Sequence, residues 1–151
     1  MQLLITQRFN KARIQNSLIE QTKYNDCTFF NCNFNSVIWN KCHFHNTSFL
    51  HNTTLNKCKF VDCKFTGQHT NMGGPTTYVD CVFENVLFKN IQFWGATFNS
   101  CNMTGVANNV VFYGNDAPKD WETKFINVDI RQLKLELVDF RCNFDLSKTS
   151  K

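Results

Sequence analysis

Cysteine and histidine are the residue types in this chain that could support reactive chemistry. Cysteine thiols can form disulfides, bind metals or act as nucleophiles. The chain has no pair of cysteines spaced as C-x-x-C, and every cysteine stands two residues before a phenylalanine or a methionine. This shared position indicates small, inward-facing apolar residues that fill a core, so we expect neither disulfides nor a metal centre. The eight are Cys27, Cys32, Cys42, Cys58, Cys63, Cys81, Cys101 and Cys142.

The four histidines are His43, His45, His51 and His69. His43 and His45 flank Phe44, so both rings are expected to face outward, as solvated side chains rather than zinc ligands. The chain contains no G-x-S-x-G, H-E-x-x-H, phosphate-binding or dinucleotide-binding motif. We therefore expect no catalysis and no cofactor.

The spacing of the large apolar residues organises the chain. Between Asp26 and Phe65 one recurs at nearly every fifth position, with a small residue two places before it. A period of five fits neither an α-helix nor a simple strand, which indicates a repeat architecture. We call the large residue the centre of its pentad. One pentad cannot close a core, so successive turns of the chain must stack into a solenoid that buries the centres.

Several pentads resemble the repeat of the pentapeptide-repeat family: C-T-F-F-N from Cys27, C-N-F-N-S from Cys32, C-K-F-V-D from Cys58 and A-T-F-N-S from Ala96. The resemblance implies an all-β fold, a right-handed quadrilateral parallel β-helix with four pentads per coil and one on each side of a square. With twenty residues per coil, Cys81 would lie under Cys101, and Cys42 under Cys63 after a one-residue slip.

The pentad frame predicts a single domain over residues 1–151. Followed backwards it reaches Phe9, so the solenoid is expected to start near residue 7, with residues 1–6 as an N-terminal cap. Followed forwards it slips by one residue between Phe49 and Leu55, which predicts a bulge at a corner. Residues 145–151 form a tail beyond the last centres, which include Leu135. Unpaired coil ends are adhesive edges, so we expect either this tail or a second copy, as a homodimer, to cover the last coil.

Two breaks interrupt the frame, near residues 67–75 and 115–122, and they contain both prolines of the chain. Glycine and proline favour turns, so both segments are predicted to leave the wall as projecting loops. The step between the flanking centres is the same in both, from Phe65 to Tyr78 and from Phe112 to Phe125. This equal spacing predicts two loops of similar construction.

Some outward positions are apolar, which predicts exposed apolar ladders where such residues are twenty apart, as Phe30 and Leu50 are. The ladders are either ordinary surface or a docking strip for another protein or a second copy. The outward apolar residues are Leu18, Phe30, Ile38, Leu50, Val82, Leu87 and Trp94. As partner-binding residues we predict Trp94, Trp121, Met72, Asp116, Asp120, Phe30 and Leu50.

The charge balance is mildly basic, with 16 Lys and Arg against 12 Asp and Glu, a net charge of +4. This is typical of a solvated surface, and nucleic acid is not expected as a partner because Arg and Lys are sparse. No apolar run is long enough to span a membrane, and the first residues lack the features of a secretory signal. We expect a cytoplasmic protein of bacterial origin.

Three functional hypotheses follow, led by a non-enzymatic protein-binding scaffold. The C-x-F runs and the two loops resemble the Qnr group, with its microcin immunity member, which protects DNA gyrase or topoisomerase IV from inhibitors. That resemblance implies antibiotic resistance or immunity, with the loops as contact elements. The group is acidic and resembles a DNA rod, whereas this chain is basic, which argues against DNA mimicry.

The second hypothesis is a secreted or luminal recognition module. The phenylalanine-rich pentads are also similar to the luminal domain of the synaptic vesicle glycoprotein 2 family, where Asn46, Asn52 and Asn102 would be glycosylation acceptors. The third is a binder of nucleic-acid surfaces through basic N-terminal faces.

Overall fold

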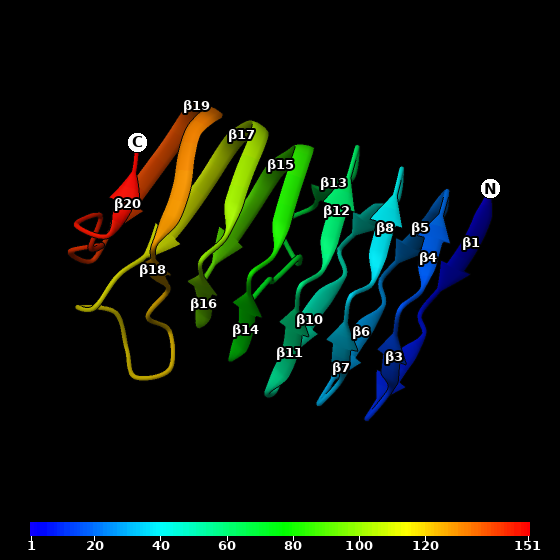
Figure 1. Ribbon diagram of the computed structural model, residues 1–151. Coiled ribbons are helices and arrows are strands. Elements are labelled where there is room, and N and C mark those ends of the chain that lie inside the picture. The colour runs from blue at the N-terminus through cyan, green and yellow to red at the C-terminus, as the bar shows by residue number, and fades with distance from the viewer.

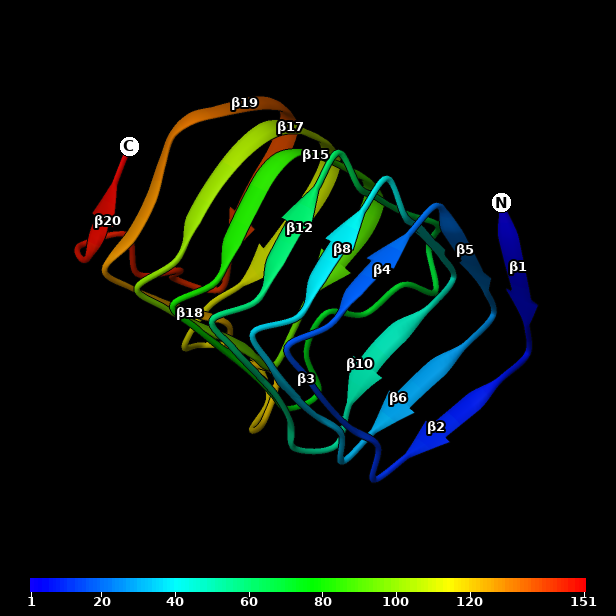
Figure 2. The ribbon, with the colours of Figure 1, turned by 45° about the vertical axis from the view of Figure 1, so that its right-hand side comes forward.

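The computed structural model describes all residues 1–151 and shows a chain of strands wound into a four-sided tube (Figures 1 and 2). Most strands have three or four residues, and each of these strands lies on a single side of the tube. Each pairs in parallel with the strands one coil earlier and one coil later. The expected parallel β-helix is thereby confirmed, with about seven turns and no helix.

The sides are numbered in chain order. Side one contains β1 (Gln2–Ile5), β5 (Thr22–Asn25), β9 (His43–His45) and β13 (Lys64–Thr66). Side two contains β2 (Arg8–Asn10), β6 (Thr28–Phe30) and β10 (Ser48–Leu50). Side three contains β3 (Arg13–Gln15), β7 (Asn33–Asn35), β11 (Thr53–Asn56), β14 (Thr76–Val79), β16 (Ala96–Asn99) and β18 (Lys124–Ile126). Side four contains β4 (Leu18–Glu20), β8 (Ile38–Asn40), β12 (Lys59–Val61) and β20 (Thr149–Ser150).

Three longer strands turn two corners and contribute to sides four, one and two in succession. They are β15 (Val82–Phe93), β17 (Asn102–Tyr113) and β19 (Val128–Arg141). These strands join the ladders of sides four and one into a single sheet. The later coils therefore contain longer uninterrupted strands than the early ones.

The corners explain the period of five. In the regular pentads the residue two places after the centre has a left-handed backbone, for example Asn31 with φ 50° and Asn46 with φ 45°. Asparagine tolerates this conformation better than most residues, which accounts for its frequency at these positions. His51 and Asn52 are both left-handed, with φ 52° and 67°, and they absorb the predicted one-residue slip. Leu55 is fully buried as the next centre.

The core consists of columns of aromatic rings that run along the tube. On side four the ring centroids of Trp39 and Phe60 lie 4.7 Å apart with an interplanar angle of 4°, and Phe83 follows 4.9 Å beyond Phe60. Neighbouring parallel strands are about 4.8 Å apart, so rings at equivalent positions must stack at about that distance. Within a coil the rings meet edge to face, as Phe34 and Trp39 do at 72°.

The burial of the centres confirms the pentad frame. All of the phenylalanines on which the prediction most depends are fully buried: Phe34, Phe49, Phe88 and Phe98. The predicted inward position of the cysteines is also confirmed for seven of the eight, which are buried, whereas Cys142 is half-buried. Cys32 illustrates how the thiols are satisfied: its Sγ lies 3.2 Å from the carbonyl oxygen of Phe9 and 3.3 Å from that of Phe30.

The prediction of an N-terminal cap over residues 1–6 is wrong. Residues Gln2–Ile5 form β1, which pairs in register with β5 as the first side of the first coil. Leu4 packs against the core. The physical reason is visible in the sequence, because Leu4 stands five residues before Phe9 and continues the frame.

The prediction of a single projecting loop over residues 67–75 is wrong for the middle of this segment, which lies in the wall. Asn71 bridges to Gln92, and Met72 is fully buried at the centre position of side two. The segment therefore contains a complete wall unit, with small insertions at the corners on either side of it. Residues 115–122, in contrast, contain no strand and project between sides two and three, as predicted.

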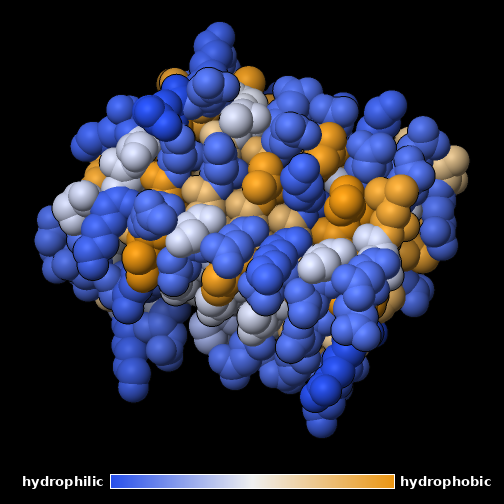
Figure 3. All heavy atoms as spheres, in the orientation of Figure 1, coloured by the Kyte–Doolittle hydropathy of each residue, from blue (hydrophilic) through white to orange (hydrophobic).

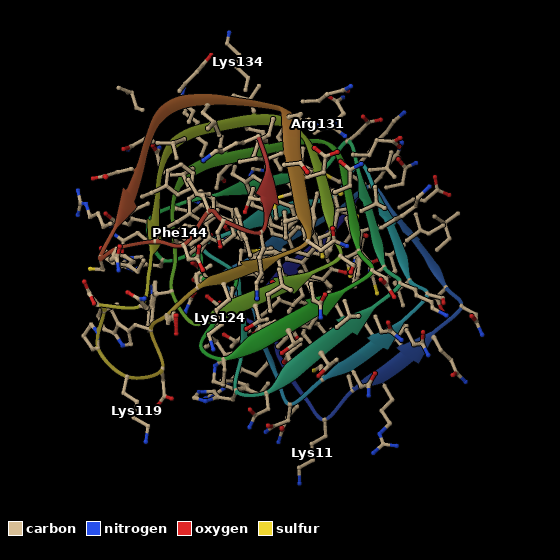
Figure 4. The ribbon with its side chains drawn as sticks, turned by 60° about the vertical axis from the view of Figure 1, so that its left-hand side comes forward. Lys11, Lys119, Lys124, Arg131, Lys134 and Phe144 are labelled. Carbon is tan, nitrogen blue, oxygen red and sulfur yellow. The ribbon has the colours of Figure 1, made fainter.

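The C-terminal tail packs on the last coil. β20 pairs with Val128 and Asp129 of β19, and Phe144 lies over the end of the tube with its ring 5.0 Å from that of Phe125 (Figure 4). Leu135, a predicted centre, is 44% exposed because no strand stacks above it on side one. The homodimer through a coil end stays a prediction.

Candidate protein-binding surface

Side two presents a row of outward apolar residues that runs along the tube. Phe30 and Leu50 each follow a buried centre and are paired in register between β6 and β10. Trp94 and Tyr113 occupy the same position in later coils, directly after Phe93 and Phe112. Together with one loop residue they form a row that is interrupted in the fourth coil, where the equivalent position is Gly73. We call it the apolar strip, and its members are Phe30, Leu50, Trp94, Tyr113 and Trp121.

Trp121 reaches the strip from the second loop. Its ring centroid lies 4.7 Å from that of Trp94 and 6.0 Å from that of Tyr113. The loop is fixed there because the carbonyl oxygen of Trp121 accepts a hydrogen bond of 2.8 Å from the backbone N–H of Gly95. Trp121 is still 39% exposed, so the two tryptophans present one joint aromatic surface.

The N-terminal end of the strip is polar. The guanidinium carbon of Arg8 lies 4.8 Å from the ring centroid of Phe30, a cation–π contact, and the His51 ring stacks on Phe30 at 5.2 Å. Sequence reasoning missed Arg8, His51 and Tyr113. Tyr113 could have been found, because it follows a centre as Phe30 and Trp94 do.

The predicted acidic residues lie in the same loop as Trp121. Asp116 and Asp120 are exposed, and the backbone N–H of Asp116 donates to the carbonyl oxygen of Cys142 at 2.9 Å. Glu122 forms an ion pair with Lys124, with 3.7 Å between Oε1 and Nζ. The loop thus presents mixed charge beside the strip rather than an acidic patch.

Met72 cannot act as the predicted contact residue. Its side chain is fully buried among the centres, and its carbonyl oxygen accepts a 2.7 Å hydrogen bond from the hydroxyl of Tyr78. The break in the sequence suggested a loop, whereas the residue is part of the wall.

A second apolar patch lies on side four. Leu18 is 57% exposed and Ile38 is 38% exposed, and they are paired in register between β4 and β8. Figure 3 shows apolar side chains as separate patches among hydrophilic ones. The Leu18 and Ile38 pair contains no aromatic residue, which makes it a weaker anchor than the apolar strip.

The two outward histidines of side one share one hydroxyl group. His43 Nε2 and His45 Nδ1 each lie 2.7 Å from Thr66 Oγ1. Burial lowers the pKa of His43 to about 4, with smaller contributions from Lys23, His45 and Lys64, so this ring is neutral at pH 7. No group of three or more His, Cys, Asp or Glu side chains is placed to hold a metal ion.

The buried thiols are expected to be unreactive. Seven of the eight are buried, and their Sγ atoms lie against backbone carbonyl oxygens, as that of Cys81 does at 3.3 Å from the carbonyl oxygen of Leu55, so a reagent cannot reach them. Titration of the folded protein with a chromogenic disulfide reagent should therefore modify only the half-buried Cys142 promptly. All eight should react in denaturant. The variant Cys142→Ser should show no prompt reaction, and two or more prompt thiols in the native protein would contradict this assignment.

The comparisons with known proteins agree with the repeat and the fold. The family described as Pentapeptide repeats matches residues 27–67 with eight copies. No curated protein sequence matches the chain significantly. The structure contains no helix long and apolar enough to cross a membrane.

Among solved structures, full-length QnrB1, described as a plasmid-mediated fluoroquinolone resistance protein, is similar with a TM-score of 0.62 and 13% identity. The match covers 98% of this chain and 81% of QnrB1. Rfr23, a pentapeptide-repeat protein from the cyanobacterium Cyanothece 51142, gives a TM-score of only 0.31 at 8% identity, over 98% of this chain and 90% of Rfr23. Residues 27–67 therefore match the pentapeptide-repeat family, and the parallel β-helix of the whole chain is similar in fold to QnrB1.

Proposed function

We propose that this chain is a non-enzymatic scaffold that binds another protein through side two, and that the partner is a bacterial type II DNA topoisomerase, which it protects from an inhibitor in the cytoplasm. The observation that carries the proposal is the apolar strip, in which the half-buried Trp94 of the wall and the exposed Trp121 of the second loop lie with their ring centroids 4.7 Å apart. Solvent-accessible tryptophans are typical anchors of protein interfaces.

The identity of the partner is supported by two likenesses. The repeat resembles the Qnr group, and the fold is similar to that of QnrB1, a fluoroquinolone resistance protein. The net charge of +4 favours contact through apolar and mixed-charge surfaces rather than imitation of a DNA rod.

A comparison of two double variants tests the proposal. In a DNA gyrase supercoiling assay with ciprofloxacin, the unchanged protein should preserve supercoiling, and Trp94→Ala with Trp121→Ala should not. The dissociation constant for purified gyrase should rise about 30-fold or more for this variant, since loss of one hot-spot residue costs about 2 kcal/mol. The matched control is Leu18→Ala with Ile38→Ala, which removes the exposed apolar pair of side four.

The outcomes separate the two parts of the proposal. If the unchanged protein neither binds gyrase or topoisomerase IV nor alters inhibition, the partner is wrong. If both double variants bind as tightly as the unchanged protein, side two is not the binding surface.

A further inference from the structure

The two ends of the tube differ in how they are covered. At the C-terminal end, β20 and Phe144 pack on the last coil. At the N-terminal end, the first coil consists of β1 to β4, and these strands pair only with those of the second coil (Figure 2). The centres of the second coil are buried, whereas those of the first are only half-buried. The half-buried centres are Leu4, Phe9, Ile14 and Ile19.

The backbone of the first coil has unpaired hydrogen-bonding groups at this end. In β1, the N–H groups of Gln2 and Thr6 donate to carbonyl oxygens of the second coil, at 3.0 and 2.9 Å. Successive residues of a strand direct their N–H and C=O groups to opposite sides, so those of Leu3 and Ile5 point away from the second coil. The same alternation leaves such groups on both sides of each centre in β2, β3 and β4. An edge of this kind is a template for pairing with another strand.

Exposed apolar side chains of the first coil lie on two adjacent sides, apart from the terminal Met1. On side one, Leu3 is 54% and Ile5 is 53% exposed, and on side four Leu18 is 57% exposed. The side chains next to the centres of sides two and three are polar: Arg8, Asn10, Arg13 and Gln15. The open end therefore has an apolar half, formed by β1 and β4, and a polar half.

The shape of this edge selects its occupant. The edge winds around four sides of a square, so one extended segment can cover a single side, whereas another four-sided coil can cover all of them. A second copy turned by a twofold axis perpendicular to the tube has the same hand of winding, so its open edge rises parallel to the first. With this axis at the corner between sides four and one, β1 lies antiparallel to β4 of the second copy, and β2 lies antiparallel to β3.

The centres of the first coil match one another in this arrangement. One register places centre opposite centre on every side, because residues 4 and 19 have the same midpoint in the sequence as residues 9 and 14. The half-buried centres of the two copies then cover each other and extend the aromatic and aliphatic core across the junction. The opposed centres are Leu4 with Ile19, and Phe9 with Ile14.

The outward residues are also compatible in this register. Ile5 lies opposite Leu18 of the second copy, so the exposed apolar residues of β1 and β4 contact each other across the junction. The guanidinium carbon of Arg8 lies 4.8 Å from the ring centroid of Phe30, which holds this charge toward the second coil. No two like charges lie directly opposite, since Leu3 faces Glu20, Arg8 faces Gln15, and Asn10 faces Arg13.

We propose that two copies of this chain pair through their first coils and form a closed twofold dimer. The unpaired backbone groups of each copy bond with those of the other, and the two tubes share one continuous core. Since β20 and Phe144 pack on the opposite end, the assembly stops at two copies. The inference goes beyond the proposed function and does not depend on it, because Trp94 and Trp121 lie several coils away.

Sedimentation velocity of the full chain tests the dimer. At concentrations of about 1–100 µM, the 17.6 kDa chain should shift to a species of twice that mass as its concentration rises. Ile5→Lys with Leu18→Lys places like charges opposite each other at two symmetric positions, so it should raise the dissociation constant of the dimer about tenfold or more. Ile5→Lys with Leu18→Glu places opposite charges there and should dimerise clearly better than the variant with two lysines.

The matched control is Leu135→Lys with Leu137→Lys, which adds the same charges at exposed leucines of the C-terminal end and should leave dimerisation unchanged. A chain that stays monomeric, or a dimer that this control dissociates, would overturn the inference. Equal dissociation of the two Ile5 and Leu18 variants would overturn the antiparallel register. Should these variants not fold, hydrogen exchange of the unchanged protein decides: the Leu3 and Ile5 amides should become protected only as the dimer forms, and constant exchange would contradict the proposal.

Discussion

Replacing Phe60 by alanine is expected to lower the free energy of unfolding by about 4 kcal/mol. Phe60 is fully buried at the middle of the side-four column, stacked between Trp39 at 4.7 Å and Phe83 at 4.9 Å. The alanine variant would leave a cavity that the strands cannot close, because their separation is fixed by backbone hydrogen bonds. Urea denaturation followed by circular dichroism measures the loss as a lower midpoint.

Phe9→Ala is the matched control for this prediction. Phe9 belongs to the first coil, is only half-buried and stacks on a single neighbour, Phe29, at 4.7 Å. Its removal should cost about half as much, because fewer contacts are lost and solvent can enter the space. Equal losses for the two variants would show that the columns are not closely packed in the interior.

Replacing Gly105 by alanine is expected to cost about 3 kcal/mol or more, which corresponds to a fall of about 10 °C in the melting temperature of a chain of this size. Gly105 has a φ of +121°, and an added Cβ would lie 2.0 Å from the carbonyl oxygen of Val86 and 2.5 Å from its nitrogen. Both obstacles are backbone atoms of the preceding coil, so no side-chain movement can relieve them.

Gly74→Ala separates this effect from the general cost of losing a glycine. Its φ is +88°, but the nearest atoms belong to side chains rather than to the backbone, Leu50 Cδ2 at 3.0 Å and Asn71 Nδ2 at 3.1 Å. Differential scanning calorimetry should therefore show a clearly smaller loss for Gly74→Ala. If Gly105→Ala has the same melting temperature as the unchanged protein, the backbones of the fifth and sixth coils do not approach as closely as the structure shows.

The sequence was sufficient for the architecture because each pentad repeats the same physical pattern. Spacing alone located the buried phenylalanines, seven buried cysteines and the one-residue slip between Phe49 and Leu55, which the structure places at His51 and Asn52. Spacing could not distinguish the two breaks, although both separate their centres by 13 residues. The step from Phe65 to Tyr78 includes the buried centre Met72, whereas the step from Phe112 to Phe125 is one pentad with eight additional residues.

The candidate surface was only partly predictable, because it depends on the path that the chain takes through each insertion before it rejoins the wall. Phe30 and Leu50 are twenty residues apart, so the period placed them together. Trp94 and Trp121 are 27 residues apart, and only the path of the second loop brings their rings to 4.7 Å.

The parallel pairing of the coils fixes the spacing of equivalent outward residues along the axis of the tube. Each coil advances the wall by one strand spacing, about 4.8 Å, so the height of any outward residue along the axis is a whole number of such steps. Phe30 lies on the second coil and Tyr113 on the sixth. The four steps between them amount to about 19 Å. A partner that touches both ends must carry complementary groups at that separation, and the addition or loss of a coil between them would change the fit by one full step.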